Sequence, residues 1–156
     1  MIDLMDAIAA RLRTLLVGQE FPCIGAVQSM VPRVSLRSFP PRNFTPEDTE
    51  GLPDVVIYRL RQAIGFCQPD VQLGILWRLP HPTPDISTGA ENYYRLAEEG
   101  IDRADEIMGK MLAEGRRIEG WDLAGVLAAE YGINEDGDQP DNYSLVVYKI
   151  TATKKR

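Results

Sequence analysis

The stretch TGAENYYRLAEEGIDRADEIMGKML, residues 88–112, decides the fold. Thr88 and Glu91 spell a capping box, in which the Thr hydroxyl accepts from the Glu91 backbone N–H and the Glu carboxylate accepts from the Thr88 N–H. Apolar residues then recur at spacings of three and four, which predicts an amphipathic helix with one apolar stripe. The stripe consists of Tyr94, Ala97, Ile101, Ala104, Met108 and Met111.

The opposite side of this helix carries charges spaced for i,i+4 ion pairs, which are typical of a solvated face. The pairs are Glu91–Arg95, Glu99–Arg103 and Glu106–Lys110. Two alanines on the stripe and Gly100 in mid-helix favour close packing on a sheet, with helix-to-helix packing as the alternative.

Strand-like runs lie on both sides of the helix. Asp54–Leu60 is apolar on both faces until Arg59, which predicts a strand covered on two sides with one end near solvent. Val71–Leu79 alternates, and the turn-like Gln68-Pro69-Asp70 predicts that it forms a hairpin with the preceding run. Leu123–Ile133 reads as a strand, although its first half is also compatible with a helix. Tyr143–Thr151 is rich in β-branched and aromatic residues, which predicts a last strand.

The first forty residues add a helix and two shorter elements. Residues 2–16 place their large apolar side chains on one face, which predicts a helix ending near Gly18. Phe21–Met30 and Val31–Ser38 are strand candidates that could pair as a hairpin. We therefore expect residues 1–156 to form one α+β domain, with a mixed or antiparallel sheet covered by an N-terminal helix and a long central helix.

Residues 39–53 form a segment that is rich in proline and then acidic. Proline cannot donate to a sheet ladder and interrupts helices, so we expect an irregular loop. A loop of this length is either a solvated surface feature or a functional segment. Aromatic and arginine side chains are enriched at protein interfaces. The candidate contacts with a partner are Arg33, Arg37, Phe39, Arg42 and Phe44.

Composition excludes several classes of protein. The chain has 156 residues, 44% of them apolar and 26% charged, which is typical of a single globular domain. Its net charge is −6, and the only dense basic run is at the end of the tail 152–156, so specific nucleic-acid binding is not expected. No apolar run reaches the roughly 20 residues that a membrane span requires, and the acidic N-terminus does not resemble a signal peptide.

Catalytic and metal-binding patterns are not recognisable in the sequence. His81 is the single histidine and lies between two prolines, where we expect a surface side chain. Cys23 and Cys67 are isolated, which favours free thiols and gives no zinc spacing. The run 134–138 resembles a calcium loop only superficially, because Gly132 and Tyr143 occupy ligand positions. We expect no catalytic residues, no metal and no cofactor.

The order of elements resembles the tail terminator, or tail completion, proteins of long-tailed phages, including the lambda-type terminator. The resemblance rests on the N-terminal helix, the Pro-led strand from Leu52 to Tyr58, the strand from Leu73 to Pro80 that leads to a helix, and the C-terminal strand from Asn142 to Ile150. It covers most of the chain by element order and has no short defining motif. The Pro-rich segment and the long helix are larger than the family minimum.

This resemblance implies a structural virion protein of the tail, assembled in the host cytoplasm, that forms a hexameric ring of identical copies. Its implied partners are the tail-tube protein and the head–tail connector. The acidic balance is consistent with a conduit that does not hold DNA. Two alternatives remain: a soluble, non-enzymatic binding or adaptor module that uses the Pro-rich loop, and a small enzyme of unknown class.

Overall fold

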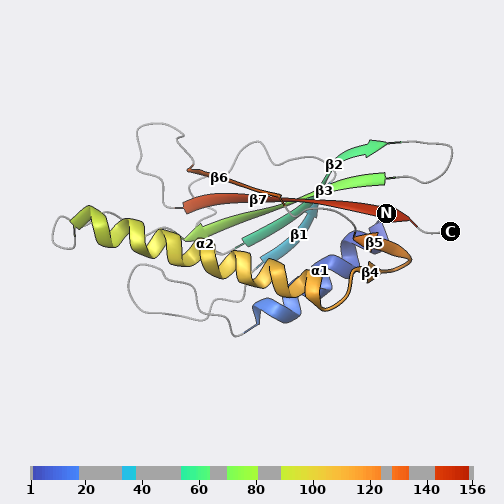
Figure 1. The fold of residues 1–156 in the computed structure, drawn as a ribbon, viewed down its shortest axis with the longest axis horizontal. Helices are drawn as coiled ribbons and strands as arrows, with labels where there is room; N and C mark the ends of the chain where they lie inside the picture. Colours follow the sequence, from blue (N-terminus) through green and yellow to red (C-terminus); the bar gives the residue numbers. More distant parts are fainter. Residues whose placement is uncertain are drawn as a thin grey trace.

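The computed structural model describes residues 2–17, 33–37, 54–63, 70–80, 89–123, 128–133 and 143–154. Two helices and seven strands follow in the order α1 (Ile2–Leu16), β1 (Arg33–Arg37), β2 (Asp54–Ala63), β3 (Asp70–Pro80), α2 (Gly89–Ala113), β4 (Arg117–Ile118), β5 (Trp121–Leu123), β6 (Ala128–Ile133) and β7 (Tyr143–Lys154). Figure 1 shows the strands in one twisted layer and both helices on the same side of it. The α+β fold class is thereby confirmed.

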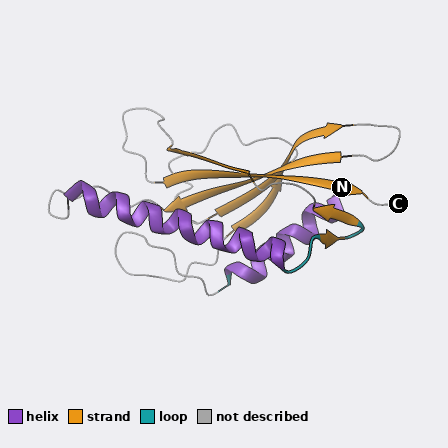
Figure 2. Ribbon diagram, viewed as in Figure 1, coloured by secondary structure: helices purple, strands orange, loops and turns teal. Residues whose placement is uncertain are grey.

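The sheet is mixed, and its neighbours run in the order β1-β2-β3-β7-β5-β4, with β6 also paired to β7. β2 and β3 form the predicted antiparallel hairpin, and β3 pairs with β7 along its whole length. β1 alone runs parallel to its neighbour, β2. Because the three long strands β2, β3 and β7 are adjacent, they form the centre of the sheet (Figure 2).

The main core lies between the helices and one face of the sheet, here called the helix face. The core residues of α1 are Leu4, Met5, Ile8, Ala9, Leu12 and Leu16. Those of α2 are Ala104, Ile107, Met108 and Met111. These positions follow the predicted helical spacing, and the alternate residues of β3 from Val71 to Leu79 meet them. α2 therefore packs over the sheet as predicted, and it also packs against α1, which was the alternative. The side chains of Tyr94 and Ala97, the first two of the predicted stripe, lie outside the described part.

Hydrogen bonds link the helices to each other and to the sheet. Arg11 Nη1 donates to the carbonyl oxygens of Met111 at 3.1 Å and Gly115 at 2.8 Å, which satisfies acceptors at the C-terminal end of α2. Tyr148 Oη donates to Asp105 Oδ1 at 2.6 Å, linking β7 to α2. On the solvent side of α2, the predicted pair of Glu106 and Lys110 forms at 3.2 Å.

The predicted strand Leu123–Ile133 is present as two pieces on the same edge of β7. β5 pairs Leu123 with Ala152, and β6 pairs Ala128 with Lys149. Between these two pairs the chain has four residues, 124–127, where β7 has two, so the two pieces do not share one register on β7. The helical alternative for Leu123–Ala129 is wrong at the residues of that run which the structure describes, 123, 128 and 129.

The sequence patterns missed the short hairpin of β4 and β5. Ile118 pairs with Trp121, which leaves Glu119 and Gly120 as a two-residue turn. Both have positive φ, +50° and +78°, as a type I′ hairpin turn requires. Lys154 Nζ lies 5.8 Å from the centre of the Trp121 ring, where a cation–π attraction ties the hairpin to the end of β7.

Candidate interaction surface

Two of the five predicted contact residues fall at the ends of β1. Arg33 pairs with Asp54 and Arg37 pairs with Tyr58 through the parallel ladder. Phe39, Arg42 and Phe44 lie outside the described residues, as do the side chains of both arginines. The structure therefore places the start of the predicted contact segment at one strand of the sheet.

The expected antiparallel hairpin of Val31–Ser38 with Phe21–Met30 cannot be assessed, because residues 21–30 lie outside the described part. The partner that the structure shows for β1 is β2. Strand residues alternate faces, so Val34 and Leu36 both turn toward the helix face and pack in the main core.

β1 is anchored on its helix side. Val34 is buried, and Arg13 Nη2 of α1 donates to the Val34 carbonyl at 2.8 Å. The chain that continues from Arg37 therefore leaves a strand that is held by both α1 and β2.

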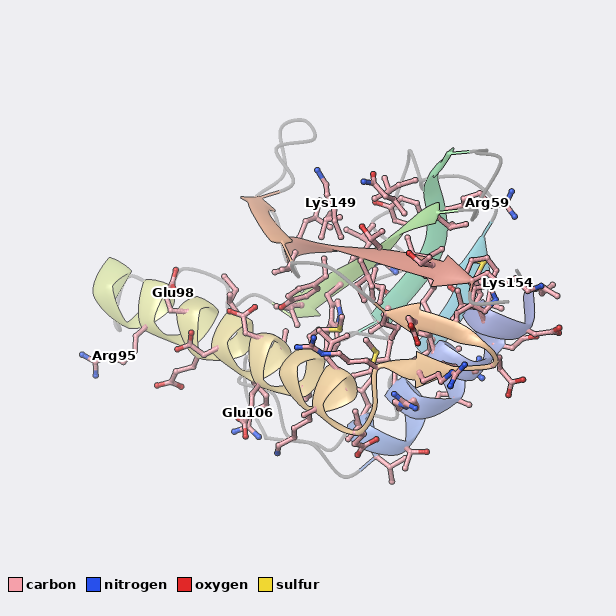
Figure 3. All side chains as sticks on the ribbon, turned by 45° about the vertical axis from the view of Figure 1, so that its right-hand side comes forward. Arg59, Arg95, Glu98, Glu106, Lys149 and Lys154 are labelled. Atoms are coloured by element: carbon pink, nitrogen blue, oxygen red, sulfur yellow. The ribbon has the colours of Figure 1, made fainter. Side chains whose placement is uncertain are left out.

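The face of the sheet opposite the helices carries a second apolar cluster, here called the outer-face strip. Three of its members are buried and come from β2 and β3: Val56, Tyr58 and Leu76. Leu60, Leu145 and Val147 are partly buried and pack against them. This confirms the prediction that β2 is covered on both sides, and Arg59 is exposed as expected. In Figure 3, Lys149 projects on this side of β7, away from the helices.

A glycine fixes how the strip packs. Gly74 of β3 pairs with Tyr58 of β2, and a Cβ at Gly74 would lie within 2.7 Å of the Tyr58 hydroxyl oxygen. Real Cβ atoms do not approach other atoms so closely, so glycine is what lets the tyrosine ring lie across β3.

One end of the strip is closed by a buried ion pair. Arg78 Nε donates to Asp54 Oδ1 at 2.7 Å, and Arg78 Nη2 donates to Asp54 Oδ2. The two side chains are 3% and 10% exposed, so the pair is almost fully removed from water. This ion pair was not predicted from the sequence. The available signal was a lone arginine inside the apolar run of β3, which the hairpin register brings opposite Asp54.

The solvent side of α2 is predominantly acidic. Exposed side chains on this helix include Arg95, Glu98, Glu99, Asp102 and Glu106. Figure 3 shows Arg95 and Glu106 pointing away from the sheet. Mixed charges on an exposed helix are most often a solvated face, and nothing in their geometry assigns them a ligand.

The structure does not describe the residues that were considered as catalytic or metal-binding candidates. His81, Cys23 and Cys67 all lie outside the described residues. Within the described ranges, no three His, Cys, Asp or Glu side chains converge as metal ligands do. In the same ranges, neither helix is both long enough and apolar enough to cross a membrane.

Compared with protein-family models and with curated proteins, the chain matches none.

Proposed function

We propose that this protein is a tail terminator: a structural virion protein that caps the phage tail tube and joins the tail to the head. In this proposal, identical copies form a ring, six in number by the resemblance, and the ring contacts the last ring of the tail-tube protein on one side and the head–tail connector on the other.

The observation that carries the proposal is the order of the elements. An N-terminal helix, the Pro-led strand β2, the strand β3, the long helix α2 and the final strand β7 occur in the order of the resemblance. They belong to one sheet with both helices on one face. Element order is a fold-level argument, and it supports the function by analogy.

The anchoring of β1 supports a contact role for the segment that follows it. Arg13 and the buried Val34 fix β1 against α1, so the Pro-rich segment 39–53 starts from a rigid base. A rigid base lowers the entropy that a contact must overcome when it forms. Repeating one such heterologous contact around an axis closes a ring.

Mixing the purified protein with uncapped tail tubes tests the proposal. Electron microscopy should show a ring of extra density at one end of each tube, and capped tubes should stop growing when more tube protein is added. Because the ring can require the tube as a template, a monomer in dilute solution is compatible with the proposal. Tubes that keep growing and carry no end density would contradict it.

The same experiment distinguishes the tail-terminator proposal from the adaptor alternative. A binding module that uses the Pro-rich segment would bind a partner as a monomer and leave tube growth unchanged. Deleting residues 39–50 would abolish partner binding in both cases, so the tube-capping measurement is the one that distinguishes them.

A further inference from the structure

The two halves of α2 are held differently. In the C-terminal half, Ala104, Ile107, Met108 and Met111 are buried in the main core. Asp105 is bonded to Tyr148 of the sheet. This half is therefore part of the structure that unfolds only when the core does.

The N-terminal half extends away from this anchorage. Figure 1 shows the first turns of α2, in yellow-green, running past the end of the sheet. The described side chains before Gly100 are those of Arg95, Glu98 and Glu99, and all three are exposed. Backbone hydrogen bonds along an exposed helix are characteristic of segments that open at low free energy.

Gly100 lies where the two halves meet. It is buried, its backbone is helical, and a Cβ built on it would have no described atom within 4 Å. Neither its backbone conformation nor a described neighbour requires glycine here. Glycine in a helix interior is unfavourable relative to alanine, so Gly100 lowers the stability of the helix at this junction.

We propose that α2 opens as two cooperative units that meet at Gly100. The projecting unit, residues 89–99, opens and changes direction while the unit from 101 to 113 stays with the core. The projecting unit is then the part of the fold that can adapt to a neighbouring surface without loss of the core. This two-unit behaviour belongs to the isolated chain and holds whatever the protein assembles with.

Gly109 provides a matched control. It also lies inside α2, and a Cβ built on it likewise meets no described atom within 4 Å. It falls within the anchored unit. Gly100→Ala and Gly109→Ala therefore make the same chemical change in the same helix, at the proposed boundary and within the anchored unit, at a buried and an exposed position respectively.

Amide hydrogen exchange of the full chain measures the units directly. The first four N–H groups of a helix have no helical acceptor, so the informative amides of the projecting unit are those of residues 93–99. In the unmodified protein, these amides should exchange through an opening that depends weakly on urea, because it exposes little surface. The amides of residues 104–111 should show the steep urea dependence of global unfolding.

The two variants should then differ in which amides exchange more slowly. Gly100→Ala should slow exchange at residues 93–99 by about fivefold, the factor expected from the alanine preference in helices. Gly109→Ala should leave those amides unchanged and slow only residues 104–111. Equal slowing at residues 93–99 by both variants would show that α2 is one unit. No slowing there by Gly100→Ala would place the boundary elsewhere, and either result overturns the proposal. The urea dependence of the unmodified protein decides the same question if a variant fails to fold.

Discussion

The guanidinium of Arg78 and the carboxylate of Asp54 face each other across β3 and β2 as a buried, bidentate ion pair. The two residues are also direct partners in the strand ladder. One cross-strand contact therefore specifies the register of the central hairpin and closes one end of the outer-face strip. A hairpin slipped by one residue would leave both charges unpaired.

Removing the arginine should destabilise the protein strongly. Arg78→Met leaves the Asp54 carboxylate buried without its cation, and the expected loss is about 3–5 kcal/mol in the free energy of unfolding. The measurement is urea unfolding followed by circular dichroism. The double variant Asp54→Leu with Arg78→Met removes both charges and should recover part of the loss. An Arg78→Met variant within about 1 kcal/mol of the parent protein would contradict this account of the pair.

Adding one methyl group at Gly74 should disturb Tyr58. The new Cβ would overlap the tyrosine ring, which is itself buried, so Gly74→Ala should cost about 1–3 kcal/mol. The cause can be isolated by a double-mutant cycle, because the penalty should largely disappear when Tyr58→Ala is already present. If the two changes are simply additive, the close approach of ring and glycine is not the reason for the cost.

The hydroxyl of Tyr148 should contribute measurably to docking α2 on the sheet. Tyr148→Phe removes the donor to Asp105 and keeps the ring against Trp77, whose centroid is 6.3 Å away. A hydrogen bond to a charged group contributes about 1.5–3 kcal/mol, so the melting temperature should fall. Asp105→Asn retains an acceptor oxygen and should lose less. A melting temperature unchanged by Tyr148→Phe would show that the bond contributes nothing.

Glu119 offers a stabilising substitution. It has φ +50° in the β4–β5 turn, a conformation that glycine and asparagine adopt more readily than other residues. Glu119→Asn should raise the free energy of unfolding by relieving part of the strain of this residue at positive φ, which costs of order 1–3 kcal/mol. Glu119→Ala is the matched control, because alanine does not favour positive φ and should give no gain. An equal gain in both variants would point to the lost charge as the cause.

Strong local periodicity predicted the long elements correctly. The stripe of α1, including Leu4, Ile8 and Leu12, is buried as its spacing indicates. The anchored half of α2 and the hairpin of β2 with β3 also follow directly from their patterns, because each pattern extends over several turns or alternations. The last strand is β7, as its β-branched and aromatic composition predicts.

Features that depend on tertiary pairing could not be predicted from local sequence patterns. Nothing within Arg33–Arg37 encodes that β1 runs parallel to β2, since strand direction depends on the connection and on the neighbouring strand. The β4–β5 hairpin was not predicted because its strands are very short and Glu119-Gly120 is not a typical turn pair. The Arg78–Asp54 pair required the register before either residue could be recognised as a partner. For the predicted contact residues, the structure gives only the backbone positions of Arg33 and Arg37.

The central claim is that this chain ends tail growth through a contact made by the segment after β1. Its most direct test is the tail length and head attachment of phage particles made with the chain lacking residues 39–50. The control is the full-length chain with Glu106→Ser and Lys110→Ser on the exposed face of the anchored half of α2. We predict that the deleted chain keeps its circular dichroism spectrum and melting transition but yields overlong, headless tails, while the control yields normal particles. Tails of normal length joined to heads, produced with the folded, deleted chain, would contradict the claim.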